Sequence, residues 1–198
     1  MLRGVLVALG VAVAVSHGVA VEPISVRGTS VTYPQAVTVP VKDRTLQLNL
    51  TGVGVRTRIG LNVYAVGSYV QDGATVRTAE DMTNVNAVRV LHLVMERGVD
   101  ANDFIGAFKA AVGKSYPADK FKTEFGQLAD AVGNKAVAKG DHIFMISEPD
   151  VGVRFRIADK VDLTVKNPAF AQALWEVYFG QKPLDETLKK GLVGLLPR

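Results

Sequence analysis

The sequence predicts an α+β fold in which helices cover one face of a large antiparallel sheet, an open-faced β-sandwich. Three observations predict it: strand-like segments rich in Val and Leu, short separations between them, and two interruptions by pairs of helix-like segments. The order is therefore strands, two helices, strands, two helices. No linker, repeat or low-complexity stretch divides the chain, so we expect a single folded domain over residues 21–198.

The first clear strands form a hairpin around Gly60. Residues 45–51 alternate strictly between polar and apolar side chains, which is typical of a half-buried strand. Gly52 and Gly54 then interrupt the alternation, as glycines do at a bulge or where another backbone comes close. Residues 62–70 form the next strand, and because so few residues join the two, we expect them to pair antiparallel.

The remaining elements are predicted from periodicity and from helix-boundary signals. Asp and Asn are favoured N-caps, Pro suits the first helical position, and apolar side chains recur every three to four residues after these signals. Further strands are expected over 87–95, 141–147, 151–157 and 160–165, with a weak edge strand within 21–33. Helices are expected after Asp100, over 118–132, after Asn167 and over 184–192, with a short helical turn within 75–83.

Composition excludes several classes of function. The chain has no cysteine, which excludes disulfides, thiol nucleophiles and cysteine metal sites. His17, His92 and His142 lie far apart in sequence without an obvious third ligand, so no metal is expected. Thr57 stands where a dinucleotide fingerprint needs its third glycine, and no cofactor is expected. Basic residues are scattered, so no nucleic-acid partner is expected.

The first 20 residues resemble a secretory signal peptide. Arg3 is followed by an uncharged apolar run and then by small residues up to Ala20, after which we place cleavage. The alternative is an uncleaved anchor, although the run is shorter than the ~20 residues of a comfortable span. Cleavage removes only Arg3 from the charged residues, which leaves 22 basic against 19 acidic residues, a net charge of +3. We therefore expect a periplasmic or secreted protein with no membrane span in the mature chain.

The most informative segment is LTGVGVRTRIGLNVYAVGSYV, residues 50–70. It places Tyr64 eight residues after Arg56, both on otherwise apolar strands, where they are able to bind one oxyanion of a hydrophobic ligand. Arg58 shares a face with Arg56 in a regular strand, but a glycine bulge shifts facing by one residue. The pattern thus leaves open whether Arg56 or Arg58 faces a cleft. It also leaves open that the arginines are solvent-exposed and that Tyr64 belongs to the core.

Three motifs in this order resemble the chalcone isomerase-like family, from about Val37 to the C-terminus. The motifs are Gly52-Val-Gly-Val-Arg56, Asn62-Val-Tyr-Ala-Val-Gly-Ser-Tyr69, and Trp175-Glu-Val-Tyr-Phe-Gly180 followed by Lys182-Pro183 and Leu188-Lys189. The resemblance implies an open-faced β-sandwich in which helices lie over a large sheet and a cleft separates them.

The resemblance also implies two kinds of activity. In plant chalcone isomerases, an Arg at the Arg56 position neutralises an oxyanion during ring closure. In the non-catalytic members, which bind fatty acids, this Arg and a Tyr on the next strand are associated with the ligand carboxylate. The present chain has Tyr64 where the enzymes have Thr, and Val177 replaces their hydroxyl residue on the C-terminal helix. Val99–Ala107 offers neither the Tyr nor the Asn of the enzymes at the matching places near the first helix, since Asn102 is off register, so the binding pattern fits better.

These observations lead to three hypotheses. The first is an exported binding protein for a small amphiphilic carboxylate, such as a fatty acid, held by Arg56 and Tyr64 in an apolar cleft. The alternative is an isomerase, an intramolecular lyase acting on a chalcone-like enone, in which Arg56 stabilises an oxyanion and the ligand is flavonoid-like. The third is a structural or interaction protein whose pocket is filled by its own side chains. The oligomeric state is left open.

Overall fold

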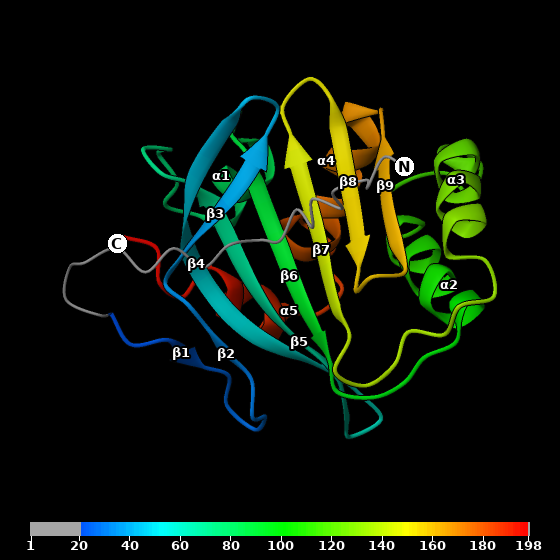
Figure 1. Cartoon of the computed structure of the whole chain (residues 1–198), viewed down its shortest axis with the longest axis horizontal. Coiled ribbons are helices and arrows are strands. Elements are labelled where there is room, and N and C mark those ends of the chain that lie inside the picture. Colours follow the sequence, from blue (N-terminus) through cyan, green and yellow to red (C-terminus); the bar gives the residue numbers. More distant parts are fainter. Residues whose placement is uncertain (1–20, 198) are drawn as a thin grey trace, which may run out of the picture.

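The computed structural model describes residues 21–197, so the predicted signal peptide lies outside the described residues. Its main feature is a seven-stranded antiparallel sheet in which every strand pairs with its neighbours in the sequence (Figure 1). These strands are β3 (Ala36–Val41), β4 (Arg44–Arg58), β5 (Leu61–Gln71), β6 (Arg89–Met95), β7 (His142–Glu148), β8 (Gly152–Ile157) and β9 (Val161–Val165). A separate two-stranded ribbon consists of β1 (Ile24–Ser25) and β2 (Thr32–Tyr33).

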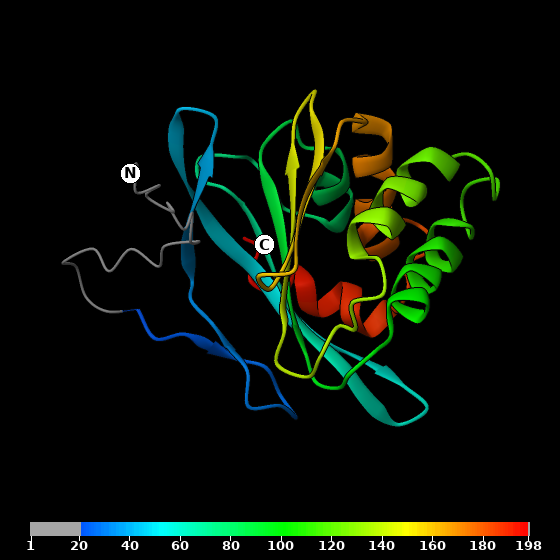
Figure 2. The same cartoon turned by 45° about the vertical axis from the view of Figure 1, so that its right-hand side comes forward.

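The larger helices gather on one side of this sheet, while the segment with β1 and β2 runs over the other side (Figure 2). This arrangement confirms the predicted α+β fold with helices on one face. The helices are α1 (Ala79–Asn84), α2 (Ala101–Val112), α3 (Lys122–Val132), α4 (Pro168–Phe179) and α5 (Glu186–Leu192). None of the helices within residues 21–197 is both long and apolar enough to cross a membrane.

Helix starts follow the cap signals where the cap is a short polar side chain. Asp100 and Asn167 accept hydrogen bonds from the first-turn amides of α2 and α4, as predicted. Helix α3 begins four residues later than expected, at Lys122, because the residues before it form turns. Helix α5 begins two residues later than expected, at Glu186, because Asp185 is its N-cap.

Strand β3 was not expected, because Pro34 and Pro40 flank and interrupt its sequence. Pro40 is tolerated because β3 is the edge strand of the sheet, where a missing amide breaks no inner ladder. Val37, Val39 and Val41 are buried against the sheet face that the β1–β2 ribbon covers. The strand is therefore held by side-chain burial on one face and by pairing with β4 on one edge.

Glycines allow α5 to lie directly on β4. A Cβ atom on Gly52 would lie 2.1 Å from the carbonyl oxygen of Gly191, and one on Gly54 would lie 2.6 Å from a methyl of Leu188. The β4–β5 register also shifts between Leu50 and Gly52. The sequence predicted either a bulge or a close backbone approach at this glycine, and Gly52 has both. These contacts fix α5 between Leu188 and Leu192 relative to the centre of β4.

Candidate ligand-binding cleft

A cavity of about 870 Å³ lies between the β4–β5–β6 part of the sheet and helices α2 and α4. Its volume falls within the ~300–1,000 Å³ of typical small-molecule sites. Most of its wall is apolar, and the apolar residues include Val63, Met95, Phe104, Phe108, Val177 and Leu184. Ile59 and Leu61, which are exposed to solvent, also line it and mark its mouth at the β4–β5 turn. The cavity has the size and lining of a site for a hydrophobic ligand.

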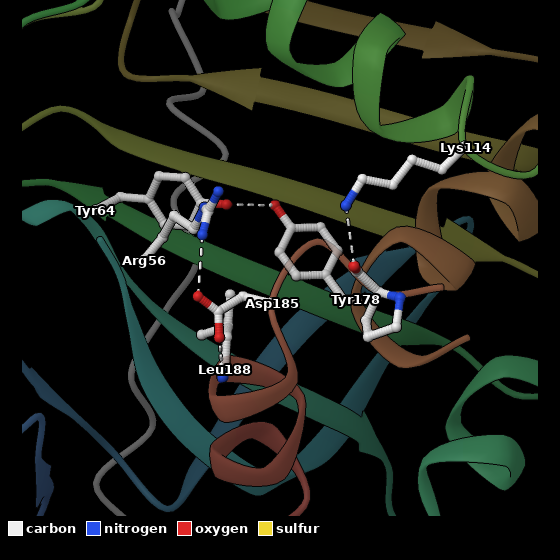
Figure 3. A network of polar contacts seen from close by, with 7 residues as sticks. Arg56, Tyr64, Lys114, Tyr178, Asp185 and Leu188 are labelled. Atoms are coloured by element: carbon white, nitrogen blue, oxygen red, sulfur yellow. Dashed lines mark hydrogen bonds and ion pairs between the residues drawn. The ribbon is translucent and has the colours of Figure 1, made fainter. Parts of the chain in front are cut away.

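Arg56 enters this cavity from β4 and is paired with a carboxylate of the protein itself. Its Nη1 donates to Oδ2 of Asp185 at 3.0 Å (Figure 3). The side chains of Arg56 and Asp185 are 23% and 24% exposed, so water reaches both partners. The other oxygen of Asp185 accepts from the amide of Leu188 at 3.0 Å and caps α5. In this structure, the charge of Arg56 is therefore balanced internally.

Tyr64 faces Arg56 across the β4–β5 pair, and its hydroxyl lies 3.2 Å from the hydroxyl of Tyr178 on α4. Burial raises the pKa of Tyr64 to about 12, and the Tyr178 bond and the Arg56 charge offset part of this rise. Burial, followed by the charge of the neighbouring Tyr64, raises the pKa of Tyr178 well above its usual range. Both phenols are therefore neutral at physiological pH. Since only one proton lies between them, one hydroxyl proton remains for a ligand.

The structure brings Arg56 and Tyr64 together, and Arg58 lines the same cavity. The β4–β5 register shifts again after Arg56, but the additional residue is Val63 on β5. Strand β4 consequently keeps its alternation, and Arg58 shares a face with Arg56. The two arginines differ in environment, because Arg58 is exposed and makes no ion pair within the described residues.

Sequence reasoning missed two residues of this site, Asp185 and Tyr178. Asp185 carries a recognisable N-cap signal, an Asp followed by Glu in the first turn, but that signal locates a helix start and not an ion pair. Its partner Arg56 is 129 residues away in sequence. Tyr178 lies on the buried side of α4 with 1% exposure, where the apolar period of the helix predicts a packing residue. Only the tertiary structure shows its hydroxyl beside that of Tyr64.

The charges around the cavity favour an anionic ligand. The charged residues that line it are four cations, Arg56, Arg58, Arg97 and Lys114, and two acids, Asp100 and Asp103. Even when the Asp185 charge is added, cations remain in excess by one. A cleft with such an excess concentrates anions at its mouth.

Residues 21–197 contain no group of three or more His, Asp or Glu side chains placed to hold a metal ion. His92 and His142 do meet, with Nε2 and Nδ1 2.8 Å apart, but they lie on the other face of the sheet. His92 stacks there on Phe144 and packs perpendicular to the ring of Tyr33. The pair is thus separated from the cleft by the sheet itself.

Together, the curved sheet, its helical cover and the partly open cavity between them define an α+β protein with a cleft between sheet and helices. The chain belongs to the chalcone isomerase-like family, whose model matches residues 26–194. Its structure is similar to the crystal structure of a fatty-acid binding protein of Arabidopsis thaliana, with a TM-score of 0.66 and 17% identity. The similarity covers 87% of this chain and 96% of that one, and at this identity it shows the fold. The sequence matches no curated protein.

Proposed function

We propose that this protein is an exported binding protein for a small amphiphilic carboxylate such as a fatty acid. The observation that carries the proposal is the polar end of the cavity, where Arg56 and the neutral hydroxyls of Tyr64 and Tyr178 adjoin an otherwise apolar wall. The fatty-acid binding function named for the structurally similar Arabidopsis protein supports the same class of ligand.

The head group would bind to Arg56 by exchange with Asp185. A guanidinium offers five N–H donors and binds carboxylates in a bidentate manner. Two carboxylates at one guanidinium repel each other, so the ligand would displace the Oδ2 contact of Asp185. Asp185 is partly exposed and keeps its second oxygen on the Leu188 amide, which allows a side-chain rotation toward water. The free hydroxyl proton of the Tyr64–Tyr178 pair would donate to the same head group.

The tail would lie along the apolar wall between the sheet and helices α2 and α4. Each buried CH₂ group contributes about 0.8 kcal/mol. A tail of about ten carbons therefore stabilises the complex by several kcal/mol before the costs of association are subtracted. The site thus obtains affinity from the tail and orientation from the head group.

Export is part of the proposal. The signal-like segment of residues 1–20 supports it, with cleavage after Ala20. N-terminal sequencing of the protein recovered from the periplasm or the culture medium of a producing bacterium tests it. A chain that still begins at Met1 would contradict cleavage.

The experiment for the ligand is denaturing extraction and mass spectrometry of purified protein, followed by titration with dodecanoate. Wild-type protein should release an amphiphilic acid in stoichiometric amount. Arg56→Ala should release little and bind dodecanoate about ten- to a hundred-fold more weakly, as expected for losing a charged hydrogen bond.

Arg154→Ala is the matched control. Arg154 is also a partly exposed β-strand arginine paired with an aspartate, Asp162, but it does not line the cavity. Its loss changes the net charge equally and should leave dodecanoate binding unchanged. Equal affinity of wild type and Arg56→Ala would refute the role of Arg56 in holding a carboxylate.

One observation supports the isomerase as a second candidate. Two neutral phenols beside an arginine are suited to stabilise an oxyanion that forms during a reaction. The internal balance of Arg56 by Asp185 weakens that stabilisation. If the wild type converts a chalcone and Arg56→Ala does not, the protein is an isomerase and the binding-protein proposal is wrong.

A further inference from the structure

The tip of the β4–β5 hairpin presents apolar side chains to water. Ile59 is 92% exposed and Leu61 is 58% exposed, although both line the mouth of the cavity. Figure 2 shows this hairpin extending past the ends of the neighbouring strands. Exposed apolar side chains that gather at the entrance of a cavity indicate an interaction surface. Single scattered ones are common on protein surfaces and indicate nothing.

The backbone at the tip is unfavourable for the residue that occupies it. Arg58 and Leu61 are paired, so the turn consists of Ile59 and Gly60, with φ of 51° and 71°. Two positive φ values define a type I′ turn, in which Asn-Gly is the preferred sequence. Among the four non-glycine residues of positive φ in the described chain, Ile59 alone is β-branched. Turn stability therefore does not explain this isoleucine, and strain of this kind marks functional surfaces.

Cations surround the apolar tip. Arg58 and Arg97 are exposed at the cavity mouth, and within residues 21–197 neither makes an ion pair. Asn62 donates to the carbonyl oxygen of Gly28, which places the β1–β2 turn, with the exposed Arg27, beside the hairpin. Of the acids that line the cavity, Asp100 is engaged in capping α2. The tip thus combines apolar side chains with cations that are free to meet anions.

We propose that the Arg58–Leu61 tip is a docking surface for an anionic lipid bilayer. Ile59 and Leu61 would enter the boundary between head groups and acyl chains, and the arginines would contact lipid phosphates. Two apolar side chains bury far less than the ~1,200 Å² of a stable protein interface, whereas bilayers accept shallow insertion assisted by charge. Docking does not depend on the proposed function. The corollary that a lipid ligand enters through the docked mouth does rest on it.

The decisive variant is Ile59→Asn, which creates the preferred Asn-Gly turn while removing the apolar side chain. It should raise Tm by about 2–4 °C because it relieves the strained φ of Ile59. It should also weaken binding to vesicles of phosphatidylcholine with phosphatidylglycerol by about ten-fold or more. Stability and vesicle affinity of the full chain then change in opposite directions, which excludes misfolding as the cause. Unchanged affinity in Ile59→Asn would overturn the proposal.

A labelled variant locates the contact directly, whatever residues 1–20 contribute. Because the chain has no cysteine, Leu61→Cys carries a single environment-sensitive fluorophore. Its emission should shift to the blue with phosphatidylglycerol vesicles, shift less with phosphatidylcholine alone, and stay unshifted when Ile59→Asn is added. Leu195→Cys, at another exposed leucine, is the matched control and should not shift. Equal shifts at both positions, or no shift at residue 61, would refute docking through the tip.

Arg58→Gln tests the charge. It should lower the affinity for phosphatidylglycerol vesicles about five-fold, the effect of one cation near an anionic surface, without changing that for phosphatidylcholine. Equal binding of wild type to both vesicle compositions would refute the role of the arginines. If the labelled tip responds only to rising protein concentration, a second copy of the chain occupies it and the bilayer proposal fails.

Discussion

Asp185 approaches Arg56 from the start of α5, and the loop that carries it is held in place independently of this ion pair. Leu184 donates its amide to the carbonyl oxygen of Val177, and Lys114 donates Nζ to that of Pro183 at 3.2 Å (Figure 3). The loop therefore keeps its place when the side chain of Asp185 turns away. This geometry allows Asp185 to release Arg56 to the carboxylate that we propose as the ligand.

Asp185→Asn should strengthen dodecanoate binding by up to about five-fold, because a partly exposed ion pair contributes up to about 1 kcal/mol. Asn caps helices as well as Asp does, and its single oxygen is used by the Leu188 amide, so Arg56 is released without loss of the helix start. Isothermal titration with dodecanoate and with dodecanol measures the effect. Dodecanol has no carboxylate and should bind Asp185→Asn and wild type with similar affinity.

Asp103→Asn is the matched control, since Asp103 also lines the cavity but does not contact Arg56. It should change dodecanoate affinity by less than Asp185→Asn does. Weaker dodecanoate binding in Asp185→Asn would show that Asp185 positions Arg56 instead of competing for it.

At the scale of elements, the packing of α5 on β4 depends on the absence of a side chain at Gly52. A Cβ atom there would meet the backbone of Gly191 and Leu192, which cannot move without shifting the helix. Thr51 adds to this contact, because its buried hydroxyl donates to the carbonyl oxygen of Leu192 at 2.9 Å. The seam between β4 and α5 is therefore a rigid part of the cleft's support.

Gly52→Ala should lower the free energy of unfolding by about 2 kcal/mol or more, as expected for overpacking a rigid contact. Urea unfolding followed by circular dichroism measures it. Gly106→Ala is the control, since Gly106 lies in α2 with open space around it and should gain up to about 1 kcal/mol from helix propensity. If both variants are equally stable, α5 does not lie against β4 as described.

The β6–β7 pair should make the protein sensitive to mild acid. Burial, and next the charge of His142, lowers the pKa of His92 from its usual 6.5 to about 3. The folded chain keeps His92 neutral, whereas the unfolded chain takes up a proton below pH of about 6.5. This contribution to stability is therefore complete above about pH 6.5 and decreases as the pH falls toward about 3.

Urea midpoints measured at about pH 7.5 and about pH 4.5 test this, since that interval lies mostly above the titration of carboxylates. The wild-type midpoint should fall over this interval. In His92→Phe, which keeps a ring stacked on Phe144, it should fall less. Equal slopes in the two proteins would show that His92 is not buried in its neutral form.

At the scale of the whole molecule, the folded structure raises the pKa of every tyrosine of the chain. Burial is the first cause of a raised pKa at all five positions, Tyr33, Tyr64, Tyr69, Tyr116 and Tyr178. The folded state therefore holds these protons more tightly than the unfolded state, whose tyrosines ionise near pH 10. The associated stability is complete below about pH 10 and is lost as the pH rises toward and beyond about 12.

We expect an alkaline titration in which phenolate absorbance rises in one cooperative step together with the loss of circular dichroism. Tyrosines with ordinary pKa values would instead ionise gradually near pH 10 in a folded protein. Tyr64→Phe should reduce the dependence of stability on pH in this range, since it removes one linked group. Gradual ionisation with unchanged circular dichroism would contradict the burial of these side chains.

Most of the fold could be predicted from local pattern because each element carries its own period and its own boundary signals. The alternation at 45–51 and the caps Asp100 and Asn167 are examples in which a few adjacent residues suffice. Strand β3 could not be predicted this way, since Pro40 is acceptable only at a sheet edge, and edges are defined by the whole sheet. Export remains a prediction, because residues 1–20 lie outside the described structure.

The candidate site, too, could be predicted from the sequence only in part. The spacing of Arg56 and Tyr64 followed from the sequence alone, because a short hairpin places both on neighbouring strands. Asp185 and Tyr178 reach them from residues more than 100 positions away, so their contacts arise only when the C-terminal helices pack onto the sheet. By itself, the sequence determined the period of each element and the chemistry of the hairpin. Only the tertiary structure decided which distant carboxylate and which phenol complete the cleft, because contacts of that sequence separation depend on packing and not on local pattern.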